Sequence, residues 1–268
     1  MALTDIQCAI LKLLSNNRRI ATNSYVAGGL ALNYKLKTPR VSRDIDVFND
    51  TREALFTSWE ADKKALLADG YSVKPLRILE TFVEAEVCKN NQSVEIQWAV
   101  DSAFRFFPLV EDDEVGFTLH PVDLATNKLL ALVGRTEVRD WIDAISAIQN
   151  LQPMAYLLSA CCGKDPGFSP LSMLEYVARR RYNQLEIDMQ IVPKGEYDAA
   201  TLCRFWHEEV DRAHEILKVF PRDKVGSVVL SKDGVLFKGD AVAFIKALDA
   251  DEIVFHQGHI GGVWPRIR

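Results

Sequence analysis

Two spacings of hydrophobic residues recur along this chain, and together they predict helices and strands in its first part. Apolar residues three or four positions apart, as on one face of a helix, mark three segments. These segments are 3–14, 52–68 and 121–149, the last being one long helix or two abutting ones. Alternating apolar and polar residues predict strands over 76–88 and 93–100, joined by a turn at 89–92.

Beyond Pro153 the helical spacing dominates. It fills 154–162, 169–189 and 198–219. Asp233-Gly234 lies in the middle of 228–237, and this dipeptide predicts a hairpin there. We therefore expect an α/β (α+β) fold with a small mixed sheet in residues 1–150. A mainly helical domain with a C-terminal hairpin is expected in residues 151–268.

A glycine pair and two acidic residues stand out between the first predicted helices. The apolar run that ends at Ala27 leads into Gly28-Gly29, and a second apolar run contains Asp44 and Asp46. Side chains alternate along a strand, so the two carboxylates are expected on one face and their apolar neighbours on the other. Mg²⁺ is commonly held by one or two carboxylates together with substrate phosphates. Glycines at a strand-to-helix turn let backbone N–H groups approach a phosphate.

Three cations recur on one side of the segment 121–149 if it is helical throughout. They are Lys128, Arg135 and Arg139, whereas Gly134 falls on the apolar side, where it would allow close packing. Such charges form a solvated face in most helices. Arginine and lysine are also the residues that hold phosphates. Because the glycine pair and the two carboxylates occur in the same chain, we favour a cationic lining for a triphosphate.

These motifs resemble those of the AbiEii/AbiGii (MenT-like) nucleotidyltransferases, which lie in the DNA polymerase β-like superfamily. The residues that carry the resemblance are Gly28, Gly29, Ser42, Asp44, Asp46, Lys128, Ala131, Arg135, Arg139, Asp140 and Asp143. The resemblance covers roughly residues 20–150. Several members of the family are toxins of toxin–antitoxin or abortive-infection systems. Some transfer a nucleoside monophosphate to the end of a tRNA, and others have no known activity.

The resemblance implies roles for the first group of motif residues. Gly28, Gly29 and Ser42 would contact phosphates of a nucleoside triphosphate (NTP). Asp44 and Asp46 would be the ligands of Mg²⁺, with Mn²⁺ as an alternative.

The resemblance also implies roles for the second group. Lys128 would bind the triphosphate, assisted by Arg135 or Arg139. Asp140 or Asp143 would act as a base or orient a neighbouring group. The implied partners are an NTP, an RNA acceptor such as a tRNA 3′ end, and a cognate antitoxin protein.

One position departs from the superfamily pattern. Polymerase β-like enzymes often have a third carboxylate on a neighbouring strand, and that position holds Gln97 here, with Glu95 and Asp101 as other candidates. Loss of this charge weakens a two-metal mechanism. The alternatives are therefore a catalytically degraded nucleotide-binding module, or a nucleotidyltransferase that modifies a small molecule.

The composition limits the partners and the cellular compartment that can be expected for this protein. The net charge is −5, so any nucleic-acid contact needs a local basic patch, for which Arg179-Arg180-Arg181 is one candidate beside its usual role as a solvated face. No apolar run is long enough to span a membrane, and the start lacks the pattern of a signal peptide. The five cysteines show no metal-binding spacing. A cytoplasmic protein with reduced thiols is expected.

Overall fold

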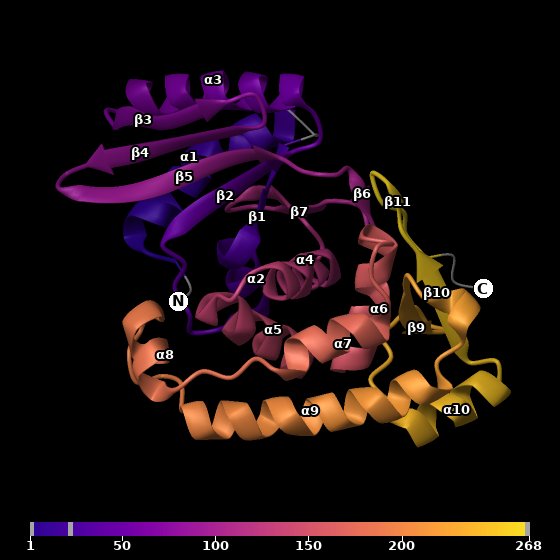
Figure 1. Ribbon diagram of the computed structural model, residues 1–268. Helices are drawn as coiled ribbons and strands as arrows, with labels where there is room; N and C mark the ends of the chain where they lie inside the picture. The colour runs from indigo at the N-terminus through magenta and orange to yellow at the C-terminus, as the bar shows by residue number, and fades with distance from the viewer. Residues whose placement is uncertain (1–2, 21–23, 266–268) are drawn as a thin grey trace. The chain divides into compact units, whose positions relative to one another are not determined.

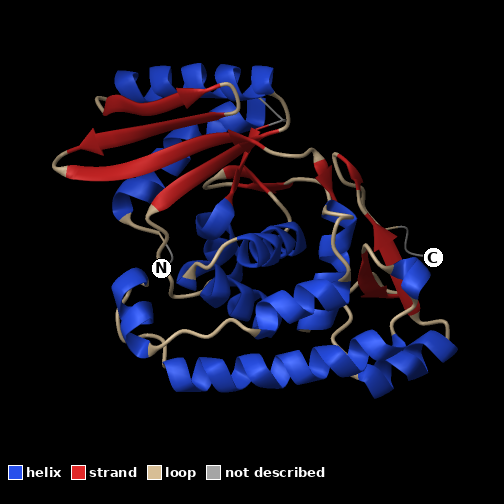
Figure 2. Cartoon of the chain, in the orientation of Figure 1, coloured by secondary structure: helices blue, strands red, loops and turns tan. Residues whose placement is uncertain are grey.

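The sheet that the alternating pattern predicts is present, and it has seven strands in the order β3-β4-β5-β2-β1-β8-β7. The structure, a computed structural model, describes residues 3–20 and 24–265 (Figure 1). It confirms the mixed α/β class, which Figure 2 shows by colour.

The chain divides into two compact units. The first consists of Met1–Ala103 and Pro108–His120, and the second of Phe104–Phe107 and Pro121–Arg268. This division differs from the boundary expected near residue 150. The reason is that α4 (Pro121–Gly134) packs against α6 and α7, and α5 (Val138–Asn150) packs against α8, so both helices join the helices that follow them.

The first unit contains the sheet and three helices among its described residues. The strands are β1 (Ser24–Ala27), β2 (Asp44–Asn49), β3 (Ser72–Leu79), β4 (Phe82–Lys89), β5 (Gln92–Val100), β7 (Val110–Asp112) and β8 (Gly116–Thr118). The helices are α1 (Asp5–Ile20), α2 (Gly28–Leu36) and α3 (Arg52–Ala68). The pairs β2–β5 and β1–β8 are parallel, and the other neighbours are antiparallel. Two helices, α1 and α3, pack on the sheet and on each other.

The single strand predicted over 76–88 is divided, because β3 ends at Leu79 and β4 begins at Phe82. Within β4 and β5 the predicted alternation is confirmed. Val83, Ala85 and Val87 of β4 are buried, as are Ile96 and Trp98 of β5. The turn between these strands is the expected one. Its two central asparagines, at positions 90 and 91, both have positive φ, as a two-residue hairpin turn of this kind requires.

A buried carboxylate ties the helices to the sheet. Asp62 of α3 is fully buried and forms an ion pair with Arg18 of α1. It also accepts hydrogen bonds from Asn17 Nδ2 at 2.8 Å and from Trp98 Nε1 at 2.8 Å. A buried ion needs such complete pairing, so this network fixes α1, α3 and β5 relative to one another.

The second unit is mainly helical, as expected. Besides α4 and α5 its helices are α6 (Met154–Lys164), α7 (Pro170–Ala178), α8 (Gln184–Gln190), α9 (Ala199–Val219), a 3₁₀ turn at Arg222–Lys224 and α10 (Ala241–Asp249). Its strands are β6 (Phe104–Arg105), β9 (Ser227–Ser231), β10 (Ile253–Gln257) and β11 (His259–Ile260).

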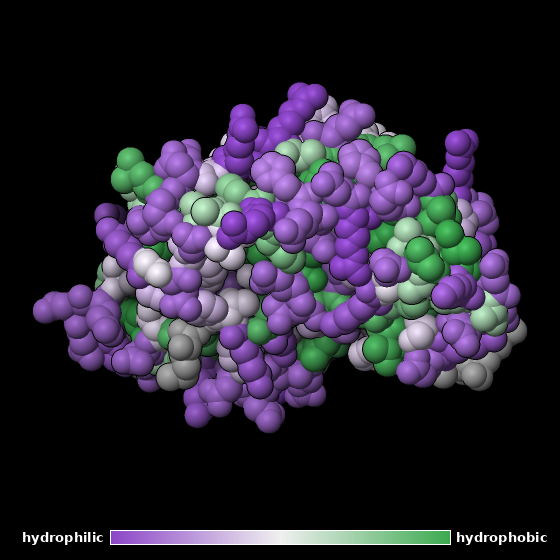
Figure 3. All heavy atoms as spheres, turned by 90° about the horizontal axis from the view of Figure 1, so that it is seen from below, coloured by the Kyte–Doolittle hydropathy of each residue, from purple (hydrophilic) through white to green (hydrophobic). Residues whose placement is uncertain are grey.

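In the view from below, hydrophilic residues cover most of the surface (Figure 3). Hydrophobic ones gather toward the side where α10 lies, and α10 exposes Val242 and Ile245. No described helix is long and apolar enough to cross a membrane.

The C-terminal hairpin predicted over 228–237 is present, but it is short. Across the turn at Asp233-Gly234, the N–H of Ser231 donates to the carbonyl oxygen of Val235 at 2.8 Å and that of Phe237 to the carbonyl oxygen of Val229 at 3.1 Å. The longer partner of β9 is β10, which pairs along its whole length. Only an isolated bridge joins Leu230 to Leu236. Gln152 Nε2 donates to the carbonyl oxygens of Val229 at 2.7 Å and Phe237 at 2.9 Å. This amide therefore bridges the two arms of the short hairpin in addition to their own backbone hydrogen bonds.

Candidate active site

The two aspartates of β2 lie on the same face of the sheet, as their spacing predicts. Asp44 and Asp46 are partly exposed, whereas Ile45 and Val47 between and beyond them are buried. Strand β1 pairs Ala27 with Asp46 in the antiparallel register. The second carboxylate therefore lies across from the residue at which β1 ends and α2 begins.

Gly28 begins α2 with a φ of +66°, in the left-handed region that favours glycine. A Cβ added at Gly28 would overlap the carboxylate of Asp46. Ala27, which precedes the helix, provides no side-chain cap for the amides of its first turn. A helix N-terminus favours negative charge, so the start of α2 and the Asp46 carboxylate form a cradle in which only glycine fits.

Ser42 was expected to contact a phosphate, and in the structure its side chain contacts Asp44. Its Oγ donates to Asp44 Oδ1 at 3.0 Å, and the residue is buried. Its carbonyl oxygen accepts a hydrogen bond from Gln7 Nε2 of α1 at 2.8 Å. Ser42 thus orients Asp44 from the loop before β2, and its contact with a phosphate stays a prediction.

The position of the third acid is occupied by an amide that is hydrogen-bonded to two carboxylates. Gln97 of β5 is in register with Asp46 of β2. Its Nε2 donates to Glu95 Oε1 at 2.9 Å and to Glu84 Oε1 at 3.1 Å. Burial, a hydrogen bond with Glu95 and the negative charge of Glu95 raise the pKa of Glu84. Asp101 lies beyond the end of β5 and accepts a hydrogen bond from the backbone N–H that follows it.

The donor set fits Mg²⁺ held partly by a substrate. Within residues 3–20 and 24–265 no group of three or more His, Cys, Asp or Glu side chains is arranged to hold a metal ion. Asp44 and Asp46 supply carboxylate oxygens, the ligand type that Mg²⁺ prefers, and Mg²⁺ often takes only one or two of them. The remaining ligands would be water and phosphate oxygens.

In the second unit, the structure brings together four of the predicted residues. Lys128 Nζ of α4 lies 3.0 Å from Asp140 Oδ1 and 3.1 Å from Asp143 Oδ2, both on α5. Arg135 binds Asp140 through two nitrogens, Nε at 2.7 Å from Oδ2 and Nη2 at 3.3 Å from Oδ1. We call Lys128, Arg135, Asp140 and Asp143 the ionic cluster. Its two aspartates are fully buried, and Lys128 is 8% exposed.

The ionic cluster is balanced in charge. Burial by itself would raise the pKa of Asp140, but Lys128 and Arg135 outweigh this effect and hold the pKa below its usual value. The side chain of Arg135 remains 51% exposed, so an anion can approach this side of the cluster. The interpretation of Lys128 as part of a solvated face is wrong, because the lysine is buried between carboxylates.

Of the two alternatives for residues 121–149, the pair of helices is confirmed, and the continuous helix assumed for the cationic face is wrong. The chain leaves the helix at 135–137, so Arg139 lies in the first turn of a new helix and is no longer in line with Lys128. Arg139 Nε lies 3.9 Å from Glu137 Oε2. Gly134, predicted to allow close packing, is exposed at the end of α4 with open space where a Cβ would be.

Comparison with known proteins identifies the fold. Neither the family models nor the curated proteins contain a match to this sequence. Among solved structures, the nucleotidyltransferase toxin MenT4 of Mycobacterium tuberculosis matches with a TM-score of 0.57 and 16% identity, over 81% of this chain and 83% of that one. JHP933 of Helicobacter pylori matches with a TM-score of 0.53 and 15% identity, over 81% of this chain and 95% of that one. The chain has a nucleotidyltransferase fold. The resemblance seen in the motifs is thus confirmed at the level of the fold.

Some residues that support this nucleotidyltransferase fold gave no signal in the sequence. Gln7 is buried in α1 and holds the loop before β2, although a lone glutamine in a helix has no distinctive pattern.

Cys161 and Cys162 are buried, and burial raises the pKa of Cys162 to about 11, which agrees with packing rather than redox chemistry. His256 Nε2 lies 2.8 Å from the carbonyl oxygen of Phe106, so this histidine has a structural partner.

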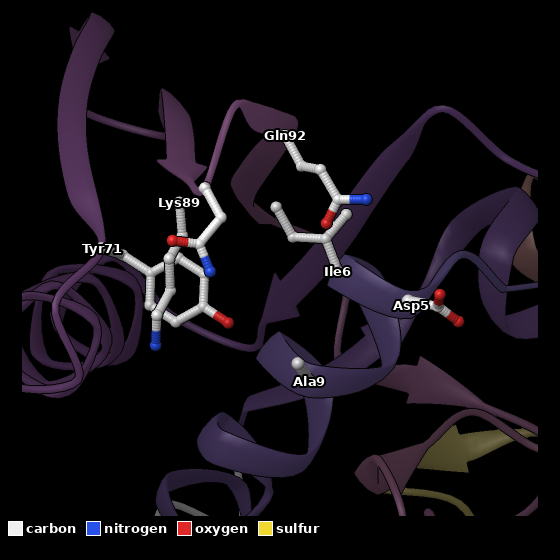
Figure 4. Close-up of a pocket in the computed structure, with 7 residues that line it drawn as sticks. Asp5, Ile6, Ala9, Tyr71, Lys89 and Gln92 are labelled. Carbon is white, nitrogen blue, oxygen red and sulfur yellow. The ribbon is translucent and has the colours of Figure 1, made fainter.

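A separate pocket of about 300 Å³ lies in the first unit of the nucleotidyltransferase fold, between the start of α1 and the turn of the β4–β5 hairpin (Figure 4). Its lining residues are Asp5, Ile6, Ala9, Tyr71, Lys89, Asn90 and Gln92. Lys89 lies over the ring of Tyr71 at 4.5 Å, and its Nζ is 2.8 Å from Asp69 Oδ2. None of the predicted site residues lines this pocket.

Proposed function

We propose that this protein is a Mg²⁺-dependent nucleotidyltransferase that moves a nucleoside monophosphate from an NTP to a hydroxyl acceptor. The acceptor oxygen attacks the α-phosphorus and forms a new ester bond. The bond between the α-phosphorus and the bridging oxygen breaks, pyrophosphate leaves with its electrons, and the hydroxyl proton is released to solvent.

The cradle at the start of α2 carries this proposal. Two carboxylates on one strand face, beside a glycine that lies against the Asp46 carboxylate, support a site for a metal-bound phosphate in a nucleotidyltransferase fold. Asp44 and Asp46 would hold Mg²⁺, or Mn²⁺ in its place. Bound Mg²⁺ would supply charge neutralisation to the triphosphate and the leaving pyrophosphate. The amides of Gly28 and Gly29 would donate to a phosphate oxygen.

The ionic cluster is proposed as the second contact for the triphosphate. Arg135 offers a charged side chain that is half exposed, and Lys128 offers a positive charge that its two aspartates hold in place. In this role Asp140 and Asp143 orient the lysine instead of acting as a base. Arg139, at the start of α5, would assist from solvent.

The acceptor and the biological setting follow from the resemblance. We propose an RNA acceptor, with a tRNA 3′ end as the first choice, and a toxin-like role in the cytoplasm that a cognate antitoxin restrains. MenT4, which shares the fold, is a nucleotidyltransferase toxin. A small-molecule acceptor is the alternative within the same chemistry.

A catalytically degraded nucleotide-binding module is the second candidate function. Gln97 favours it, because an uncharged amide is in register with Asp46 and both of its polar contacts go to neighbouring carboxylates. Such a protein would bind an NTP with Mg²⁺ but leave it intact.

The test is incubation of the purified protein with each of four α-³²P-labelled NTPs, Mg²⁺ and total RNA. A variant carrying Asp44→Ala and Asp46→Ala is run beside it. Label on a tRNA-sized band with the wild type alone supports the proposed RNA nucleotidyltransferase and names the nucleotide. Label on protein or on a small molecule identifies another acceptor. Binding of an NTP without any labelled product supports the degraded module.

A further inference from the structure

We propose that Arg180 is a positioning residue that holds the ionic cluster in its nucleotide-binding arrangement, an inference that rests on the proposed function. Arg180 follows the end of α7. Its Nη1 donates to Thr136 Oγ1 at 2.9 Å, and its Nη2 donates to the carbonyl oxygen of Val133 at 3.4 Å. Thr136 lies between α4 and α5, and Val133 lies in the last turn of α4; we call residues 133–137 the corner.

This corner determines how α4 and α5 face each other. Lys128 comes from α4, whereas Asp140 and Asp143 come from α5, so the ion pairs form only if the corner keeps the two helices in register. Arg135 lies in the corner itself and grips Asp140 with two hydrogen bonds. A shift of the corner therefore moves the guanidinium, the lysine and their carboxylates relative to one another.

The contact with Val133 has a clear physical basis. The carbonyl groups in the last turn of a helix accept no hydrogen bond from within that helix. A cation near this end is also favourable. Val133 is in the last turn of α4, and the Arg180 guanidinium supplies both the donor and the charge. A Cβ added at Gly134, the next residue, would meet nothing within 4 Å, so this position adds no side-chain packing to the corner.

The segment that carries Arg180 also contacts α5. The ring of Tyr182, two residues after Arg180, packs on Trp141, the residue after Asp140, with the ring centroids 5.3 Å apart. Arg180 thus links the end of α7 to the corner, and Tyr182 links the same segment to the first turn of α5.

Loss of this link is expected to weaken nucleotide binding rather than the chemical step. Without Arg180 the corner can move, and Arg135 no longer presents its half-exposed side chain in a fixed position. Preorganised contacts give affinity by lowering the cost of ordering. A charged hydrogen bond is worth enough that its removal should weaken binding about tenfold.

The experiment measures the affinity of the full-length protein for each of the four Mg²⁺-NTPs by equilibrium dialysis. The variants are Arg180→Ala, the conservative Arg180→Lys, and Thr136→Val, which removes only the hydroxyl acceptor. Arg181→Ala is the matched control, since it loses the same charge from an exposed neighbouring position. We expect Arg180→Ala to bind about tenfold more weakly, Arg180→Lys and Thr136→Val to fall between it and the wild type, and Arg181→Ala to match the wild type.

A double-variant comparison separates positioning from general stability. If Arg180 acts through Arg135, Arg180→Ala should have no further effect on NTP affinity when Arg135→Ala is already present. Equal losses with and without Arg135, or equal behaviour of Arg180→Ala and Arg181→Ala, would overturn the inference while leaving the proposed function intact. Absence of NTP binding by the wild type would overturn the proposed function itself.

Discussion

Replacing Gly28 with alanine is the most direct test of the cradle. The change adds one methyl group at a position where the backbone has a φ of +66° and the Asp46 carboxylate lies against the Cα. Two separate costs follow. An L-residue in the left-handed region costs about 1–2 kcal/mol. The new Cβ also forces Asp46 away from its present position.

A second glycine allows these two costs to be separated. Gly70 has a φ of +81° in the same unit, but nothing lies within 4 Å of a Cβ added there. Gly70→Ala therefore carries the backbone strain without any steric overlap. We expect both variants to lose about 1–2 kcal/mol of unfolding free energy, with a further loss for Gly28→Ala.

The two variants should differ much more in metal binding than in unfolding free energy. Disturbing the groups that hold a metal ligand in place typically costs about 10- to 100-fold in metal affinity. We expect Gly28→Ala to lower the affinity for Mn²⁺ in the presence of NTP, followed by electron paramagnetic resonance, by up to about 100-fold, equivalent to about 2.7 kcal/mol. Gly70→Ala should bind like the wild type. If the two variants bind Mn²⁺ and NTP equally well, Asp46 does not depend on the glycine cradle and the reasoning is refuted.

Three further predictions concern stability. Asp62→Ala leaves the Arg18 guanidinium buried without its carboxylate, so the unfolding free energy in urea should fall by about 3–5 kcal/mol, and a loss under about 1 kcal/mol would contradict the role of the pair. The pKa of Glu84 is raised above its unfolded value, so its ionisation beside Glu95 costs stability as the pH rises above about 4.3. Glu84→Gln should therefore raise the thermal midpoint at pH 7 but not near pH 3, and an equal shift at both would rule this out. The pKa of Asp140 is lowered, so its ion pairs contribute stability above about pH 3.9 and lose it as the pH falls through the lower folded value. Urea unfolding of Asp140→Asn should thus change less over that acid range than that of the wild type, whereas parallel curves would speak against it.

The first half of the candidate site could be predicted from the sequence because its geometry is local. Residues two apart on a strand share a face whatever the strand packs against, so the spacing of Asp44 and Asp46 was sufficient. The same holds for the asparagine turn of the β4–β5 hairpin, where residue type and backbone conformation are directly linked. The glycine pair marked the turn into α2, although not the close approach of Asp46.

The ionic cluster shows where such reasoning fails. A helical projection placed Lys128, Arg135 and Arg139 in one arc, because it assumed that the helix continues through 135–137. The break at that corner folds α5 back beside α4, so Lys128 meets Asp140 and Asp143 instead of solvent. Arg180, which is distant in sequence, contacts this corner, and no local pattern could show that contact.

The sequence by itself determined the elements, the α/β class and the shared face of the two β2 carboxylates, since these depend on alternation and on residue conformation within a few positions. Only the tertiary structure decided that β9 pairs with β10, that α4 and α5 join the helical unit, and that Gln97 binds Glu84 and Glu95. These outcomes depend on which distant segments bury the most apolar surface and satisfy the most polar groups together. A local sequence pattern carries no information about which of the distant segments will pair.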